Sequence, residues 1–486
     1  MNMRRTVLLI LFTLLVFPVI GQDRIIVRSC RPGLEKIDLS KHTQRRVSAQ
    51  RRSDGDTVVN PYIGERRQLV VLAKFADQGF LGDSLHTLEQ WDKILNTKNL
   101  SDTALYGSLH DYFYAQSYGQ FDIGFDLLYV GVDSMEKYHS TSVDDENSKY
   151  LVQDVVSIIS NNVNDWGLYD WNKDGKVDQL LIIYAGRGQN DGGSSMTIWP
   201  HQWWLSERVN FAPIPVTTGP DTYLIDAYCA VPELSGRDDY GSFGTLCHEF
   251  SHCLGLPDFY GNKDYVGEWD LMDHGNFNGR GFHPCGYSAY ERAYLGWLTP
   301  VELDSDTVIT GMKALSDAPV SYLIRNEGWA DEYYLVENRQ KKEWDEMLPG
   351  SGIVVFHVDY DENIFQRGWV NSSNEQRYVI FAANDEPYAA DPFMKGWAYP
   401  HNDNNSLTNT STPAAELNNL NKDGSLFMSK PITEMTVTEG IASFSFRNDM
   451  ATGVPYIHQE RFRKDDSWYR IDSRLYIHQG KVVLVR

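Results

Sequence analysis

Two histidines and a glutamate near the middle of the chain have the types and spacing needed to hold and use a metal ion. His248 and His252 are four residues apart, so on a helix both imidazoles lie on one face and can bind the same ion. Glu249 follows the first histidine, where its carboxylate can contact a metal-bound water without being a ligand. The set predicts a hydrolytic zinc site with Glu249 as the general base.

The residues that follow predict how a third ligand arrives. Gly255 lies where a helix that ends in a left-handed turn requires glycine, and Pro257 prevents the helix from continuing. The chain can then reverse and bring Asp258 to the metal, and a carboxylate oxygen is an acceptable zinc ligand. Met272 has the position of a Met-turn. The pattern resembles the metzincin signature H-E-x-x-H-x-x-G-x-x-H, with Asp258 in place of the third histidine.

Two further histidines lie near this segment. His274 follows Met272 by two residues, and it could either steady the oxyanion as it forms or only close the turn. The sequence leaves these two roles open. His201 lies in the aromatic stretch IWPHQWW, and we expect it at the surface or at the edge of a substrate site rather than on the metal.

A second metal site is predicted in the segment DWNKDGKVD. Asp170, Asn172 and Asp174 fall at alternate positions, and a glycine at the sixth position permits the sharp turn that lets their oxygens converge, as in the first half of an EF-hand loop. Asp178 at the ninth position and the backbone carbonyl of Lys176 complete the expected ligand set. Oxygen ligands suit calcium. The alternative is a polar turn that caps the next strand.

Composition and the first residues predict an exported protein. The chain has 486 residues and a net charge of -22, which argues against nucleic-acid binding. Arg4 and Arg5 precede an apolar run at 7–20, so residues 1–21 are expected to be a signal peptide. Since no later run of 18 apolar residues exists, no membrane span is expected in the mature chain, which we expect to be monomeric and extracellular or at the cell surface.

Residues 22–60 are basic and turn-prone, and they are expected to form a propeptide. Cys30 within it could hold the zinc before activation, or it could be incidental. Export permits disulfides between the other four cysteines, and we expect Cys229 to pair with Cys247 and Cys253 with Cys285. Four buried free thiols are the alternative.

Short apolar runs and amphipathic patterns predict the elements around these motifs. Strands are expected at 68–75 and 180–184 and helices at 105–116 and 150–159, which favours an α/β arrangement for a catalytic domain at 61–300. A β-rich, sandwich-like domain is expected at 301–447, with strands at 320–324, 332–338, 352–358 and 377–382 and a long loop at 401–424. Residues 448–486 are expected to form a short β element for sorting or docking. The whole chain is therefore expected to be α+β.

Six segments resemble the immune inhibitor A family of secreted metallopeptidases. They include GTLCHEFSHCLGLPDFY at 244–260, EWDLMDHG at 268–275 and DWNKDGKVDQLLIIYAG at 170–186. The resemblance extends over residues 66 to 447. It implies zinc at His248, His252 and Asp258, Glu249 as the catalytic residue, structural calcium and export as a zymogen.

The expected function is that of a secreted zinc endopeptidase acting on extracellular proteins or peptides. One alternative is a non-catalytic secreted module that binds protein through its β-rich part and keeps a vestigial zinc site. It is disfavoured because every residue that the chemistry requires is present. Another alternative is a zinc hydrolase that cleaves a non-peptide bond, which the residues alone do not exclude.

Overall fold

The structure is a computed structural model. It describes residues 60–447, except 102–103, 141–144, 262–265, 374, 387–389 and 392, and the backbone of three strands between 468 and 484. The expected signal peptide, Cys30 and nearly all of the expected propeptide lie outside the described residues.

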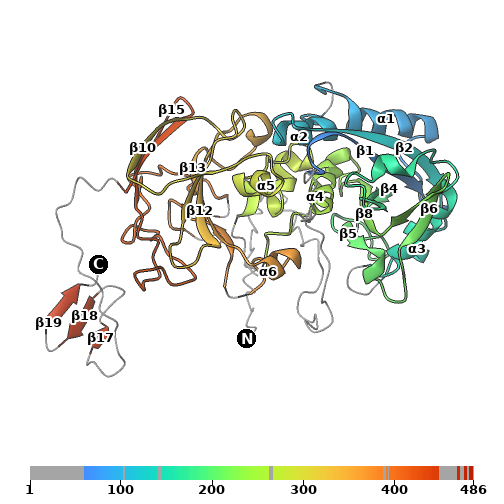
Figure 1. Cartoon of the computed structure of the whole chain (residues 1–486). Helices are drawn as coiled ribbons and strands as arrows, with labels where there is room; N and C mark the ends of the chain where they lie inside the picture. Colours follow the sequence, from blue (N-terminus) through green and yellow to red (C-terminus); the bar gives the residue numbers. More distant parts are fainter. Residues whose placement is uncertain are drawn as a thin grey trace, which may run out of the picture.

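The first half of the chain is built on a five-stranded sheet in the order β2-β1-β4-β8-β5 (Figure 1). All neighbours in this sheet are parallel except β5, which runs antiparallel to β8 at one edge. Its strands are β1 (Gly64–Lys74), β2 (Phe121–Gly131), β4 (Leu180–Arg187), β5 (His201–Trp204) and β8 (Ala227–Leu234). A smaller sheet holds β3 (Lys176–Val177), β6 (Ile214–Thr218) and β7 (Asp221–Ile225).

The predicted strands of this half are confirmed. The run QLVVLAKF lies within and just beyond β1, and LLIIY opens β4. The two strands pair in parallel at Val70–Leu181. Nearly every residue of β4 is buried, as expected for a central parallel strand that is covered on both faces.

Five α-helices accompany this sheet. They are α1 (Ser84–Asn96), α2 (Leu109–Gln116), α3 (Ser148–Ile159), α4 (Phe243–Cys253) and α5 (Ala289–Tyr294). The helix predicted at 105–116 begins only at Leu109. Ser108 is its N-cap and forms a capping box with Asp111, which fixes the start of the helix.

The second half is β-rich, as predicted. A five-stranded sheet has the order β14-β13-β12-β11-β9, and a three-stranded sheet has the order β10-β16-β15. The first contains β9 (Val301–Glu302), β11 (Tyr322–Arg325), β12 (Glu332–Arg339), β13 (Gly352–Asp359) and β14 (Tyr378–Ile380). The second contains β10 (Thr307–Met312), β15 (Ile432–Thr438) and β16 (Ile441–Phe446). A short helix, α6 (Glu362–Gln366), follows β13, and no regular helix or strand is assigned at 401–424.

Strand β12 separates two hydrophobic cores. Tyr334 and Val336 pack in a core between the two sheets of the β-rich half. Leu335, which points to the opposite face, belongs to the core that contains the five-stranded sheet of the first half. The first core therefore continues past residue 300 into β12, β13 and β14, so the two halves are packed together rather than strung apart.

Near the C-terminus, β17 (Trp468–Arg470), β18 (Leu475–His478) and β19 (Lys481–Leu484) pair as an antiparallel sheet. These strands match the alternating pattern predicted for the end of the chain. None of the helices in the described parts of the chain is long and apolar enough to span a bilayer.

Candidate active site

Helix α4 carries both histidines and the glutamate, and it packs against β8 and β5. Every residue from Phe243 to His252 is buried. At its first turn, Gly244 permits a very close approach, because a Cβ there would lie 1.8 Å from the carbonyl oxygen of Asn276. The segment that follows the Met-turn therefore lies directly against the first turn of α4.

The end of α4 turns as the sequence predicts. Gly255 has φ +96°, and its N–H donates to His252 O at 2.9 Å. The N–H of Leu256 donates to Ser251 O at 3.2 Å, which completes a Schellman motif. The reversal points the chain back toward the histidines.

The structure brings the three predicted zinc ligands together. Asp258 Oδ1 lies 3.2 Å from His248 Nε2 and 3.1 Å from His252 Nε2. All three side chains are buried. Within the described residues, this is the one group of at least three His, Cys, Asp or Glu ligand atoms that all lie within 4.8 Å of one another.

The opposite nitrogen of each imidazole faces a main-chain carbonyl. His248 Nδ1 lies 2.9 Å from Leu271 O, and His252 Nδ1 lies 2.8 Å from Leu256 O. Since a carbonyl only accepts, each Nδ1 is the donor to its carbonyl, and each Nε2 is the nitrogen that faces Asp258. Outer partners of this kind fix the ring orientation and tautomer of metal-binding histidines.

The acidic members of the site are also buried. Burial alone would raise the pKa of Asp258, but the facing imidazoles of His252 and His248 hold it well below its usual range. Asp258 is therefore a carboxylate. The side chain of Glu249 is 1% exposed and comes from the same helix as the two histidines.

The Met-turn segment supports both ends of the ligand set. Met272 is fully buried, and its carbonyl accepts the N–H of Phe259, the residue after Asp258, at 2.9 Å. The preceding carbonyl, Leu271 O, is the one that faces His248. Asp270 shapes this turn by accepting the N–H of Met272 at 2.8 Å. Sequence reasoning missed Asp270, although its place two residues before Met272 is typical of a carboxylate that organises a turn.

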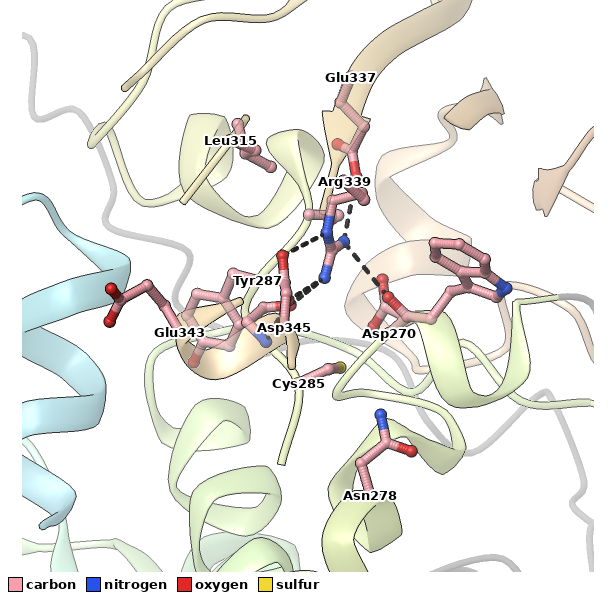
Figure 2. A network of polar contacts seen from close by, with 12 residues as sticks. Asp270, Asn278, Cys285, Tyr287, Leu315, Glu337, Arg339, Glu343 and Asp345 are labelled. Atoms are coloured by element: carbon pink, nitrogen blue, oxygen red, sulfur yellow. Dashed lines mark hydrogen bonds and ion pairs between the residues drawn. The ribbon is translucent and has the colours of Figure 1, made fainter. Parts of the chain in front are cut away.

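A buried charge network joins this turn to the β-rich half. Arg339 is fully buried and forms ion pairs with Glu337 at 3.1 Å and Asp345 at 2.7 Å (Figure 2). Its guanidinium also donates to Trp269 O and to Gly286 O, at 3.3 and 2.9 Å. Burial raises the pKa of the neighbouring Asp270 to about 7.

His274 is the first residue of the 3-10 helix η7 (His274–Gly281), and its side chain is partly exposed. Its Nε2 lies 3.7 Å from Asp273 Oδ1, and it is not part of the three-ligand group. This placement beside the Met-turn is compatible with both roles that the sequence leaves open.

His201 differs from the expectation. It is 7% exposed, with Nε2 3.0 Å from Ser148 Oγ and Nδ1 2.6 Å from Trp199 O. Burial, together with the nearby Arg208, lowers its pKa to about 3. The prediction of a surface or substrate-edge role is therefore wrong, because β5 turns this side chain into the interior.

The expected disulfides are also wrong. Cys229, Cys247, Cys253 and Cys285 are all free thiols. The thiol that faces Cys253 belongs to Cys229 on β8. Cys285 packs instead near Gly275, where an added Cβ would lie 2.3 Å from its sulfur.

In the predicted calcium loop, side-chain oxygens accept hydrogen bonds from main-chain N–H groups of the same loop. Asp170 accepts the N–H groups of Asp174 and Gly175 at 3.1 and 2.9 Å, and Gly175 has φ +84°. Asn172 Oδ1 also accepts from Asp174 N at 3.0 Å, and Lys176 begins β3. The carboxylates of this loop do not meet the 4.8 Å spacing of the zinc group. Burial, together with the nearby Asp170 and Asp174 carboxylates, raises the pKa of Asp178 to about 7.

Comparison with known proteins agrees with this geometry. Residues 86–298 match the family described as "Immune inhibitor A peptidase M6, catalytic domain". This part of the chain is similar to the catalytic domain of the immune inhibitor A (M6) peptidases. The matched range contains α4, Asp258 and Met272, so the M6 domain includes the whole three-ligand group.

Two curated relatives align with part of this chain. Immune inhibitor A of Bacillus thuringiensis subsp. alesti is 31% identical over 166 residues, which cover 29% of this chain and 22% of the relative. The pre-pro-metalloprotease PrtV of Vibrio cholerae serotype O1 (strain M66-2) is 26% identical over 178 residues, covering 31% and 19%. The chain thus aligns with about a fifth of the length of each relative.

Proposed function

We propose that this chain is a secreted zinc-dependent endopeptidase that hydrolyses peptide bonds of extracellular proteins. The observation that carries the proposal is the convergence of His248, His252 and Asp258 within 4.8 Å on the family's catalytic domain. Two neutral imidazole nitrogens and one carboxylate oxygen are a ligand set of catalytic zinc sites, in which a fourth position stays open.

The donor set fits zinc for a further reason. Three buried polar groups would otherwise face one another without a compensating cation, which is costly in a protein interior. A zinc ion held there would act as a Lewis acid, lowering the pKa of a bound water and polarising the scissile carbonyl. Glu249 would take the proton of the attacking water and deliver it to the leaving amine.

His274 is proposed as the group that steadies the developing oxyanion. Its position at the start of η7, two residues after Met272, supports this role. Replacement by alanine should lower turnover and leave zinc content unchanged. Full turnover in His274→Ala would assign this residue to the turn alone.

The edge strand β5 supports a peptide as the substrate. It is the last strand of its sheet, runs antiparallel to β8 and packs against α4. An extended peptide can add to such an edge through main-chain hydrogen bonds. This arrangement would hold a substrate backbone close to the metal helix, which favours a peptide bond over other hydrolysable bonds.

We further propose calcium at Asp170, Asn172, Asp174, Asp178 and the carbonyl of Lys176. The left-handed turn at Gly175 and the alternate oxygen side chains support it. Export as a zymogen and a monomeric state are part of the same proposal. Export is supported by the apolar run at 7–20. The zymogen form is supported by the similarity to the family.

The deciding experiment compares the wild-type protein with Glu249→Gln and His252→Ala. We expect one zinc per wild-type chain and chelator-sensitive cleavage of casein. Glu249→Gln should keep the zinc and lose most turnover, because only the base is removed. His252→Ala should lose the zinc.

Other results would favour the binding module or reject one of the assigned residue roles. Stoichiometric zinc without cleavage of any protein would favour the binding module with a vestigial site. Full activity in Glu249→Gln would reject the assigned base, and full zinc content in His252→Ala would reject the ligand set.

A further inference from the structure

The loop that presents Asp258 is held on two sides, and one side belongs to the β-rich half. The N–H of Phe259 donates to Met272 O in the Met-turn. Its carbonyl accepts from Asn371 Nδ2 at 2.7 Å, a residue 112 positions further along the chain. The residue next to the third proposed ligand is therefore fixed at both of its main-chain groups.

Asn371 is fully buried, and its side-chain amide makes all four of its hydrogen bonds. Besides Phe259 O, its Nδ2 donates to Tyr378 O at 2.7 Å, and its Oδ1 accepts from Arg377 N and Tyr378 N at 3.0 and 3.1 Å. The main chains also touch, because a Cβ on Gly261 would lie 1.9 Å from Asn371 O. The Asp258 loop thus runs along a rigid support.

Tyr378 on β14 makes a second link. Its ring stacks on Phe259 with 3.9 Å between centroids, and its hydroxyl lies 3.0 Å from Asp270 Oδ2. The other oxygen of Asp270 accepts the N–H of Met272. One side chain of the β-rich half therefore touches both the Asp258 loop and the carboxylate that shapes the Met-turn.

Both residues lie outside the range that matches the M6 catalytic domain, 86–298. We propose that Asn371 and Tyr378 are positioning residues for the zinc ligand Asp258, so that the β-rich half completes the metal site of the catalytic half. The inference rests on the proposed zinc site. It assigns a role in that site to residues of the β-rich domain expected at 301–447.

The test measures zinc affinity of the whole chain by competition with a chromophoric chelator. Asn371→Asp keeps the shape and the acceptor oxygen but sets a carboxylate oxygen against Phe259 O. We expect zinc to bind about tenfold or more weakly, as is typical when an outer partner of a ligand is lost. The kcat of Asn371→Asp should be closer to the wild-type value at saturating zinc than at limiting zinc.

The matched control is Asn338→Asp. Asn338 is also fully buried in the β-rich half, and its Nδ2 donates to two main-chain carbonyls, Met312 O and Gly440 O, both at 2.9 Å. Its contacts lie away from the Asp258 loop. Both variants should lower the melting temperature of the zinc-free protein, but zinc affinity in Asn338→Asp should stay within about twofold of wild type, because it loses no outer partner of a ligand.

Equal zinc affinity in Asn371→Asp and wild type would overturn the inference. If Asn371→Asp does not fold, Tyr378→Phe decides, since it removes only the hydroxyl and keeps the stacked ring. A several-fold loss of zinc affinity in Tyr378→Phe supports the role, and unchanged affinity rejects it. A wild-type protein that binds no zinc would instead reject the proposed function itself.

Discussion

At the scale of single residues, the proposed ligands depend on partners that bind no metal. Leu256 O and Leu271 O each hold one imidazole, and both are carbonyls of turns that immediately precede or follow a ligand segment. The main chain thus sets both tautomers. Because no side chain supplies these carbonyls, substitution at either leucine would leave the imidazole partners in place.

The raised pKa of Asp178 predicts that calcium binding at the proposed site depends on pH. Without calcium the folded protein holds a proton on this carboxyl up to a pH of about 7, whereas an unfolded aspartate loses it near 4. Calcium requires the carboxylate. Below pH 7 the apparent affinity should therefore fall, by up to about tenfold per pH unit, and above pH 7 it should level off.

Calorimetric titration of calcium at pH 5.5 and 7.5 tests this expectation. The control is Asp178→Asn, which can still accept the N–H of Trp171. This variant should bind calcium more weakly at pH 7.5 and with a smaller difference between the two pH values. Identical wild-type affinity at both would argue against Asp178 as a ligand.

Residues that lie close in sequence could be predicted, and residues brought together by packing could not. His248, His252 and Asp258 occupy one helix and the turn after it, so their spacing alone predicts that they meet. Asn371 reaches Phe259 only because two halves of the chain pack together. The disulfide prediction failed for the same reason, since the facing of Cys229 and Cys253 depends on how α4 lies on β8.

At the scale of elements, the turn after α4 is the most sensitive point of the helix. Gly255→Ala adds a Cβ to a residue at φ +96°, and this atom would lie 2.8 Å from Tyr294 Oη. We expect the free energy of unfolding to fall by about 1–3 kcal/mol. Zinc affinity should fall too, because the same turn carries the carbonyl that faces His252. Thermal melts with and without zinc measure both effects.

Gly131→Ala is the control for this prediction. Gly131 ends β2, and nothing lies within 4 Å of the position that its Cβ would take. It should change the melting temperature little. Equal stability of Gly255→Ala and Gly131→Ala would contradict the left-handed turn.

The same contrast between local and long-range signals explains which elements the sequence revealed. β1 and β4 are continuous apolar runs and were predicted. β2 was not, although its burial alternates along FDIGFD, because an internal glycine weakens the pattern of a strand. β5 has only four residues, and only its pairing with β8 defines it.

At the scale of the whole molecule, the secondary structure changes near residue 300, but one hydrophobic core continues across this boundary. Leu335, Phe356 and Tyr378 share one hydrophobic core with the catalytic sheet. A fragment that ends at residue 300 should therefore fail to melt cooperatively and should bind zinc poorly. Circular dichroism and zinc titration of this fragment would measure both properties.

The control fragment ends at Arg447. Among the residues whose burial the structure describes, both hydrophobic cores lie before Arg447, so this fragment should melt much as the whole chain does. A fragment ending at residue 300 that melts cooperatively and binds zinc as tightly as the whole chain would show that the catalytic half is self-sufficient.

Arg339 also restricts how the two halves can move. Its guanidinium is bonded at once to Glu337 and Asp345 of the β-rich half and to Trp269 O and Gly286 O of the catalytic half. A hinge rotation between them would strip a buried cation of partners on one side, at a cost of about 3–5 kcal/mol. We therefore expect the two halves to move as one unit, so that the adjustments that admit a substrate and release its products fall to surface loops rather than to a bending of the molecule.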